Sequence, residues 1–207
     1  MTARIIPMDF AEITFTGPPI SDFSLLKKLP TAYAELLIET NGFMAFRGGL
    51  HLRGVCQSPD WHSLQLVWTG EHALHKYYPD VRSSDIPFAQ DCLCDQFLLR
   101  DNIVHKLDGE TGSITSTEFT FENFLSRAKE DPIDFLLLQP LLQFEIEGGS
   151  LKPSQSINVF PPFVAQSKDG VSLSAISTLE RISALAGFAR QIRDLPDGQS
   201  FEIRVVD

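Results

Sequence analysis

The sequence is short of basic residues, and this shortage limits the partners that suit it. Of 207 residues, 17 are Lys or Arg and 27 are Asp or Glu, so the formal net charge is −10. The longest basic run is Lys27-Lys28, and an acidic chain without a basic patch is repelled by nucleic-acid phosphates. We therefore expect no binding of nucleic acid. A basic protein is the natural electrostatic partner, although solubility alone also accounts for such a charge.

Cysteine and long apolar runs are scarce as well. The chain has 3 Cys, an odd and low number that suits a reducing compartment. Apolar runs such as Phe135 to Leu138 are far too short to cross a bilayer. The first residues lack the apolar segment of a secretory signal peptide. We expect a cytoplasmic protein that makes no membrane contact.

The remaining composition is that of a globular protein. Hydrophobic residues make up 43% of the chain, enough for one sizeable core, or for a core with a smaller appendage. Short predicted strands and helices alternate over residues 1–130, and the pattern changes after that. We predict a first domain over 1–130, with 131–207 as a C-terminal extension or a small subdomain packed on it.

Hydrophobic periodicity predicts an α+β fold for residues 1–130, a mostly antiparallel sheet flanked by helices. The predicted helical segments are Phe23–Lys28, Leu29–Gly42, Ser58–Tyr78 and a helix from Thr120 that buries Phe121, Phe124, Leu125 and Ala128. The predicted strands are Gly48–Val55, half-buried with His51 and Arg53 facing outward, and apolar runs at Ile86–Phe88 and Phe97–Leu99 that flank a polar corner. A hairpin is predicted over Arg100–Ile114, with turns at Asp101-Asn102 and Asp108–Gly112.

Residues 131–207 are predicted to form an α/β extension. A helix starts near Pro132, is interrupted or kinked at Pro140 and stops at Gly148-Gly149. The segment Leu151–Phe163 reads as a turn followed by extended chain, and Phe201–Val205 alternates as a strand. A second helix begins near Ser177 or Thr178, with an apolar stripe formed by Leu179, Ile182, Leu185, Ala186 and Ala189.

Three groups of residues suggest chemistry, but none has the usual spacing. Cys92 and Cys94 flank one residue, closer than the cysteine pairs of zinc sites, and no second pair exists. His72 and His75 lie three apart, whereas the helical metalloprotease pattern needs four with Glu between them. The acidic segment Asp108–Gly112 is explained by a turn. Buried cysteines and solvated histidines are the simpler interpretation, a metal or redox site is the alternative, and we predict no cofactor.

The order of several short motifs is more informative than any one of them. A Leu-Pro pair precedes a helix that contains Tyr33 and ends at Asn41-Gly42. An Ile-Pro-Phe-Ala segment, an acidic corner, an aromatic-led strand and a Glu-Thr-Gly turn follow. Over about Ser21 to Lys129 this order resembles the SUKH superfamily, also called the SMI1/KNR4 family. The matching residues are Leu29, Pro30, Tyr33, Asn41, Gly42, Ile86, Pro87, Phe88, Ala89, Asp91, Asp95, Phe97, Leu98, Val104, Leu107, Glu110, Thr111 and Gly112.

The resemblance implies an SMI1/KNR4-like α+β fold and a protein-binding module without catalytic residues. Bacterial members resemble immunity proteins that neutralise polymorphic toxins, often nucleases, and an acidic chain suits a basic toxin domain. Two alternatives remain: a regulatory or scaffold protein without a toxin, and a metal-dependent hydrolase that uses His72 and His75. The candidate contact residues, chosen for charge and expected exposure, are Asp60, Glu71, Asp80, Asp85 and Asp91.

One residue departs from the family pattern. Relatives tend to carry Gly just before the second Asp of the acidic corner, and this chain has Cys94 there. If that position has a positive φ, a cysteine is strained, because its Cβ crowds the backbone. Replacing Cys94 by Gly is then expected to be neutral or mildly stabilising.

Overall fold

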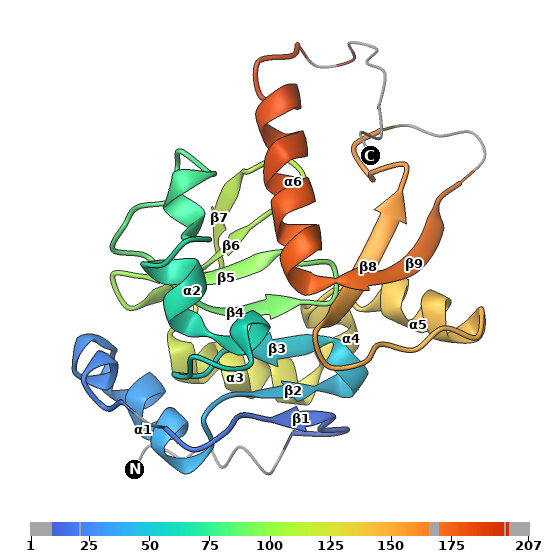
Figure 1. Cartoon of the computed structure of the whole chain (residues 1–207). Coiled ribbons are helices and arrows are strands. Elements are labelled where there is room, and N and C mark those ends of the chain that lie inside the picture. The colour runs from blue at the N-terminus through green and yellow to red at the C-terminus, as the bar shows by residue number, and fades with distance from the viewer. Residues whose placement is uncertain (1–9, 21, 166–169, 197, 199–207) are drawn as a thin grey trace.

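The computed structural model describes residues 10–20, 22–165, 170–196 and 198. Its main element is a seven-stranded antiparallel sheet in which each strand pairs with the next along the chain (Figure 1). A two-stranded sheet and six α-helices complete the part of the chain that is described. The predicted α+β class is therefore confirmed.

The elements have the following bounds. The large sheet contains β1 (Phe15–Thr16), β2 (Phe43–Ala45), β3 (Leu50–Leu52), β4 (Ile86–Asp91), β5 (Gln96–Arg100), β6 (Ile103–Leu107) and β7 (Ile114–Ser116). The small sheet pairs β8 (Gln155–Phe160) with β9 (Ser172–Ser177). The helices are α1 (Thr31–Glu39), α2 (Leu64–Trp68), α3 (Phe121–Glu130), α4 (Pro132–Phe135), α5 (Gln139–Ile146) and α6 (Thr178–Ile192). Short 3-10 helices lie at Leu25–Lys28, Phe46–Gly48, Asp60–His62 and Leu74–Lys76.

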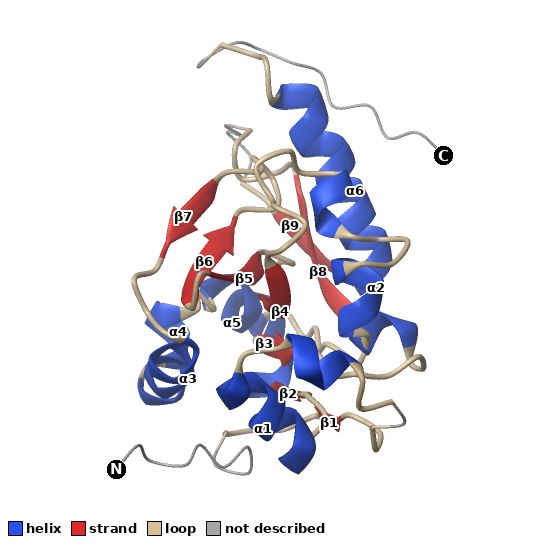
Figure 2. Cartoon of the chain, turned by 90° about the vertical axis from the view of Figure 1, so that its left-hand side faces the viewer, coloured by secondary structure: helices blue, strands red, loops and turns tan. Residues whose placement is uncertain are grey.

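The central strands of the large sheet, β2 to β5, are buried on both faces, whereas β1 and β7 at its edges are partly exposed. Helices α3 and α6 lie on opposite sides of it (Figure 2). Strand β5 shows the division, since Phe97 and Leu99 belong to the core cluster around α3 and Leu98 belongs to the cluster around α6. The ring of Phe97 lies 4.7 Å from that of Phe124 in α3, measured between centroids. The predicted alternation of this strand is confirmed.

The sequence predicts that His51 of β3 and Arg53 just after it face outward. This prediction is wrong, because both side chains are buried. His51 is 2% exposed and Arg53 is 0% exposed. Burial of a polar side chain is tolerated only when its donors and acceptors find partners inside the protein. His51 and the two Nη atoms of Arg53 meet that condition, whereas the buried Nε of Arg53 has no hydrogen-bond partner. Together the two side chains organise the centre of the molecule.

Arg53 contacts three elements, β4, β5 and α1, without contacting a carboxylate. Its Nη1 donates to the carbonyls of Pro87 (2.8 Å) and Ala89 (3.3 Å), both in β4. Its Nη2 donates to the side-chain oxygens of Gln90 and Gln96, at the two ends of the β4–β5 connection. Its carbonyl accepts from the Tyr33 hydroxyl of α1 at 2.8 Å. Burial lowers the pKa of Arg53 to about 10, so the guanidinium is still charged at pH 7.

His51 belongs to a chain of buried hydrogen bonds that ends at Asn41. The Nε2 of His62 lies 2.7 Å from the carbonyl of Asn41, which can only accept, so Nε2 carries the proton. The free Nδ1 of His62 then accepts from Nε2 of His51 at 2.8 Å. The Asn41 side chain bridges Pro18 and Val55 through three further bonds of 2.6–2.9 Å. Asn41 thus holds two loops together, in keeping with a structural role.

The helix predicted over Ser58–Tyr78 is wrong as a single element. The chain forms a 3-10 helix at Asp60–His62, the five-residue α2 and another 3-10 helix at Leu74–Lys76. The break lies at Gly70, whose N–H turns back to the carbonyl of Gln65 and whose position leaves 2.9 Å between an added Cβ and that carbonyl oxygen. The apolar positions that suggested one helix are buried except for Trp61, which is half-buried, but their spacing did not reveal this fold-back; the buried ones are Leu64, Val67, Trp68, Leu74 and Tyr78.

The C-terminal segment follows its predicted elements with a shift. The helix that starts at Pro132, α4, ends before Pro140, and Leu137 after it has φ 55°. Pro140 therefore does not kink a helix; it lies in the first turn of the next helix, α5, where proline is favourable. Gly148 ends that helix with φ 87°. The buried stripe of α6 is observed at Ile182, Leu185, Ala186 and Ala189, whereas Leu179, predicted to belong to it, is only half-buried. The strand predicted at Phe201–Val205 lies outside the described residues.

The extension shares its core with residues 1–130. Ile157 and Val159 of β8 join the cluster around α3, and the N–H of Ile157 donates to the carbonyl of Cys92 at 2.7 Å. Strand β9, which the sequence patterns did not predict, pairs only with β8 among the described strands. Within the described ranges, no helix combines the length and the apolar character needed to cross a membrane.

We predict that Arg53→Ala destabilises the protein by about 3 kcal/mol or more. The loss follows because several buried acceptors each lose a donor, at roughly 1–3 kcal/mol per unsatisfied group. Arg53→Lys keeps the charge but cannot reach both the carbonyls and the glutamines, so it is expected to cost less than Arg53→Ala. Urea unfolding measures both. The control is Arg47→Ala, which removes a side chain 46% exposed and is expected to cost at most about 1 kcal/mol. Equal losses at Arg53 and Arg47 would contradict the assigned role.

We predict that two of the five histidines resist protonation. Burial lowers the pKa of His62 to about 4 and that of His51 well below its usual value. The unfolded chain then binds these protons more tightly, so this stability is fully present above about pH 6.5 and is lost as the pH falls toward 4. For His62 the loss at pH 4 is about 3 kcal/mol. NMR titration of the imidazoles checks this, and five resonances that all titrate near pH 6.5 would refute it.

Candidate functional site

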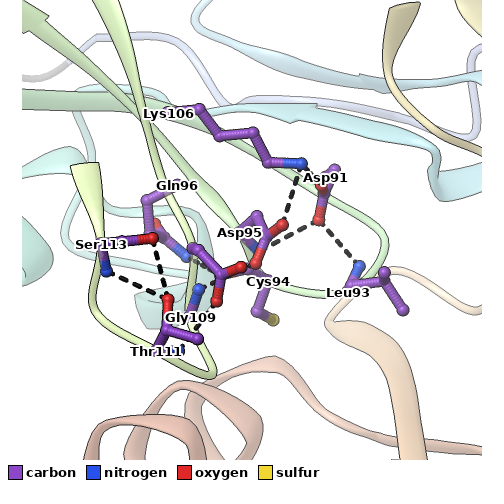
Figure 3. Close-up of polar contacts among 10 residues, drawn as sticks. Asp91, Leu93, Cys94, Asp95, Gln96, Lys106, Gly109, Thr111 and Ser113 are labelled. Carbon is purple, nitrogen blue, oxygen red and sulfur yellow. Dashed lines mark hydrogen bonds and ion pairs between the residues drawn. The ribbon is translucent and has the colours of Figure 1, made fainter. Parts of the chain in front are cut away.

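The acidic corner between β4 and β5 is held by its own first residue. One oxygen of Asp91, Oδ1, accepts from the backbone N–H groups of Leu93 (2.9 Å) and Asp95 (3.0 Å), as Figure 3 shows. These two hydrogen bonds hold the chain in a tight turn, and within that turn Cys94 takes φ 70°. The condition on which strain at Cys94 depends, a positive φ, is therefore met, and a residue with a side chain occupies a backbone conformation that favours glycine.

Lys106 of β6 joins both carboxylates of the corner. Its Nζ lies 2.9 Å from Oδ2 of Asp95 and 3.3 Å from Oδ2 of Asp91. The other oxygen of Asp95 accepts from the N–H of Gly109 at 2.8 Å, which ties the corner to the β6–β7 turn (Figure 3). Burial, and then the charge of Asp95, raise the pKa of Asp91 to about 7, while Lys106 and the two N–H donors oppose that rise. The corner and the turn thus form one rigid unit.

The expected exposure of two candidate contact residues is wrong. Asp85 and Asp91 are each 2% exposed. Asp85 accepts from Arg100 at 2.7 and 3.0 Å. Asp85 forms an ion pair with Arg100 and Asp91 forms one with Lys106, so neither side chain presents a charge to a partner.

The other three candidates, Asp60, Glu71 and Asp80, are exposed. Asp80 is joined to Asp85 only through Arg100, which also donates to the carbonyl of Asp80 at 2.9 Å. No described contact brings Asp60 or Glu71 to the corner. Their role in binding stays a prediction.

The three thiols are buried and poorly suited to ionise. Cys92 and Cys94 are each 1% exposed, and all three cysteines are free. Burial raises the pKa of Cys56 to about 11 and that of Cys94 to about 12, and it raises the pKa of Cys92 strongly. Since the thiolate is the reactive and metal-binding form, packing explains these residues better than redox chemistry does.

The described residues bring no three His, Cys, Asp or Glu side chains into an arrangement that could hold a metal ion. His72 and His75 do not share a helical face, because α2 has already ended at Trp68. The spacing argument that the sequence raised for this pair therefore has no structural counterpart.

A cavity of about 200 Å³ opens beside the acidic corner. Its walls come from the corner, the β6–β7 turn, the loop after β8 and the first turn of α6. The lining residues are Leu93, Asp95, Asp108, Glu110, Phe163, Val164 and Arg181. Three carboxylates and one guanidinium line the cavity, and Lys106, outside the lining, pairs with one of these carboxylates, Asp95. Three carboxylates against these two cations leave a small net negative charge. We call it the acidic cavity.

Glu110 shapes the rim of the acidic cavity. Its two carboxylate oxygens accept from the N–H groups of Phe163 (3.2 Å) and Val164 (3.1 Å). Nη2 of Arg181 lies 3.8 Å from Oε1 of Glu110. Burial raises the pKa of Glu110, although these donors act in the opposite direction. The clamp fixes a loop whose side chains stay in solvent, since Phe163 is 49% exposed and Val164 is 40% exposed. A pre-ordered apolar rim around a charged hollow is typical of a binding surface.

Sequence reasoning missed most of the acidic cavity. Its residues come from four segments that span 93 to 181, and no local spacing connects them. In the sequence, the acidic segment Asp108–Gly112 is the one signal of this cavity, and turn chemistry alone already explains that segment. The turn is real, with Gly112 at φ 76°, but it also supplies two of the carboxylates.

We predict that two substitutions at Cys94 differ in their effect on stability. Cys94→Gly relieves a positive φ, worth about 1–2 kcal/mol, and loses buried contacts of similar size, so its stability is expected within about 1 kcal/mol of the wild type. Cys94→Ala loses the contacts of Sγ and keeps the Cβ that strains the backbone, so it is expected to be less stable than Cys94→Gly. Thermal unfolding of both variants compares them. If Cys94→Ala is the more stable of the two, the backbone strain is absent.

Comparisons with known proteins add no relative to this description. No protein-family model matches the sequence, and no curated protein or solved structure matches it. The resemblance to the SUKH superfamily therefore stands on the ordered residues of the sequence alone. The geometry of the corner and of the acidic cavity has to supply the functional argument.

Proposed function

We propose that this protein is a non-enzymatic binding module, a cytoplasmic immunity protein that neutralises a basic toxin domain. The observation that supports this most is the acidic cavity with its exposed apolar rim. Interfaces typically centre on a few anchor side chains, often aromatic, in desolvated pockets, and the surrounding contacts exclude water. Phe163 offers such an anchor, and the carboxylates beside it offer a polar contact.

The charge of the acidic cavity selects the partner. Asp95 is paired with Lys106 and Glu110 lies near Arg181, and Asp108 adds a further negative charge to the lining. A Lys or Arg side chain of the partner is therefore favoured and an acidic one is repelled. The net charge of −10 also speeds the encounter with a basic protein, and salt weakens this effect. A basic nuclease domain has the complementary charge, because it must bind phosphates itself.

The buried thiols and the internally paired Asp85 and Asp91 also favour binding over catalysis, since the reactive side chains of the corner are consumed by structure. A regulatory or scaffold protein would use the same surface with another partner. The neighbouring gene separates these two functions: a toxin gene beside this one supports immunity, and its absence favours a regulatory role.

We predict that Phe163→Ala weakens binding to the toxin domain encoded nearby by about 10- to 100-fold, the loss that removal of an aromatic anchor produces. Asp108→Asn keeps the acceptor that holds the N–H of Thr111 but removes a charge from the cavity, so it is expected to slow association and reduce its salt dependence. Calorimetry and association kinetics measure the two effects.

The matched controls lie away from the acidic cavity. Phe23→Ala removes a ring that is 56% exposed, and Asp134→Asn removes an exposed charge that accepts from Gln139. Both are expected to leave affinity unchanged. If the wild type binds the toxin and Phe163→Ala binds it with the same affinity, this surface is not part of the interface. If the wild type does not bind the toxin at all, the immunity proposal is wrong.

A further inference from the structure

A second, larger cavity lies on the other flank of the β6–β7 turn. It measures about 450 Å³ and is bounded by the segment 75–80, by residues 111–113 of the turn and by the C-terminal part of α6. Helix α6 stands beside this end of the sheet in Figure 1. It shares no lining residue with the acidic cavity, and we call it the basic cavity.

The charge of the basic cavity runs against that of the chain. Lys76, Arg190 and Arg193 line it together with a single carboxylate, Asp80, which leaves a net charge of +2. None of these three cations forms an ion pair in the described part of the chain, whereas Arg47, Arg82, Arg100, Lys106, Arg127 and Arg181 all do. In a protein of charge −10, three unpaired cations at one hollow call for an explanation.

The end of a helix explains only part of this cluster. Arg190 and Arg193 lie in and just after the last turn of α6, where cations are stabilised by the partial negative charge of the carbonyls. That partial charge is about half a unit, so two full positive charges exceed it. Lys76 comes from a different segment, and its Nζ donates to the carbonyl of Gly70 at 2.7 Å.

The remaining walls suit an organic ligand with a phosphate group. Thr111 and Ser113 contribute hydroxyls that lie 2.9 Å apart. The floor is packed and fixed: an added Cβ at Gly112 would lie 3.2 Å from the Tyr78 ring and 3.9 Å from Ala189, and the Tyr78 hydroxyl donates to Gly109 at 3.1 Å. Tyr77 and Pro79 supply apolar surface.

Charge and size together select the ligand class. A phosphate monoester carries about −1.5 to −2 at neutral pH, which matches a net charge of +2. A volume of about 450 Å³ lies within the range of small-molecule sites and leaves room beyond a phosphate for a ring against Tyr77. We propose that the basic cavity binds a small phosphate monoester that carries a ring, such as a nucleoside monophosphate.

Calorimetry of the full chain at low salt tests this, with adenosine 5′-monophosphate, ribose 5-phosphate, inorganic phosphate and adenosine as probes. We expect the nucleotide to bind most tightly and adenosine to bind roughly tenfold more weakly or not at all, because charge-assisted contacts dominate. The ¹⁵N amide resonances of Thr111, Gly112 and Ser113 are expected to shift with the nucleotide.

The variant R190A/R193A removes two exposed arginines and is expected to keep the wild-type melting temperature while it loses roughly tenfold or more in affinity. The control K27A/K28A removes the same charge from an exposed pair elsewhere and is expected to bind normally. No heat from any phosphate probe, equal affinity in R190A/R193A, or equal losses in the two variants would each overturn the proposal. Toxin binding is a separate readout, so its failure leaves this result interpretable.

Discussion

A buried guanidinium without a carboxylate holds the centre of this fold. Arg53 is fully inside the protein, and its partners are two carbonyls of β4 and two glutamine side chains at the ends of the β4–β5 connection. A buried charge is costly unless its hydrogen bonds are satisfied, so these acceptors have to be in place for the chain to fold as it does. Gln96 in turn donates to the carbonyl of Cys94 at 2.6 Å. The shape of the acidic corner is thereby coupled to the core.

The same coupling extends to the surface. The corner is bonded through Asp95 to the β6–β7 turn, and that turn lies between two cavities of opposite charge. Helix α6 contributes Arg181 to one cavity and Arg190 and Arg193 to the other. A structural network of buried polar groups therefore positions both candidate binding sites, while the groups within the network are themselves sequestered from solvent.

The sequence predicted what is local and missed what is assembled. The strand from Phe97 to Leu99, the turn at Asp101-Asn102 and the cap of α3 at Thr120 follow from alternation and turn chemistry, and the structure has them. His51 and Arg53 were placed in solvent because polar residues usually lie there, and only distant partners such as Gln96 and His62 reveal their burial. Asp85 and Asp91 were misjudged for the same reason. Both cavities draw on α6, more than 60 residues after the turn they share, so no spacing rule could find them.

The centre of the sheet, from β2 to β5, is covered on both faces, and this has an evolutionary consequence. Residues of its strands are confined by packing on either side, so few substitutions there are tolerated. The side chains that reach solvent around the cavities come mainly from turns, from the loop after β8 and from one helix. Such segments accept substitution and insertion without disturbing a core. Lineages that inherit this scaffold can therefore change what they recognise at these segments alone, and related chains are expected to diverge fastest there while Arg53 and its acceptors stay fixed.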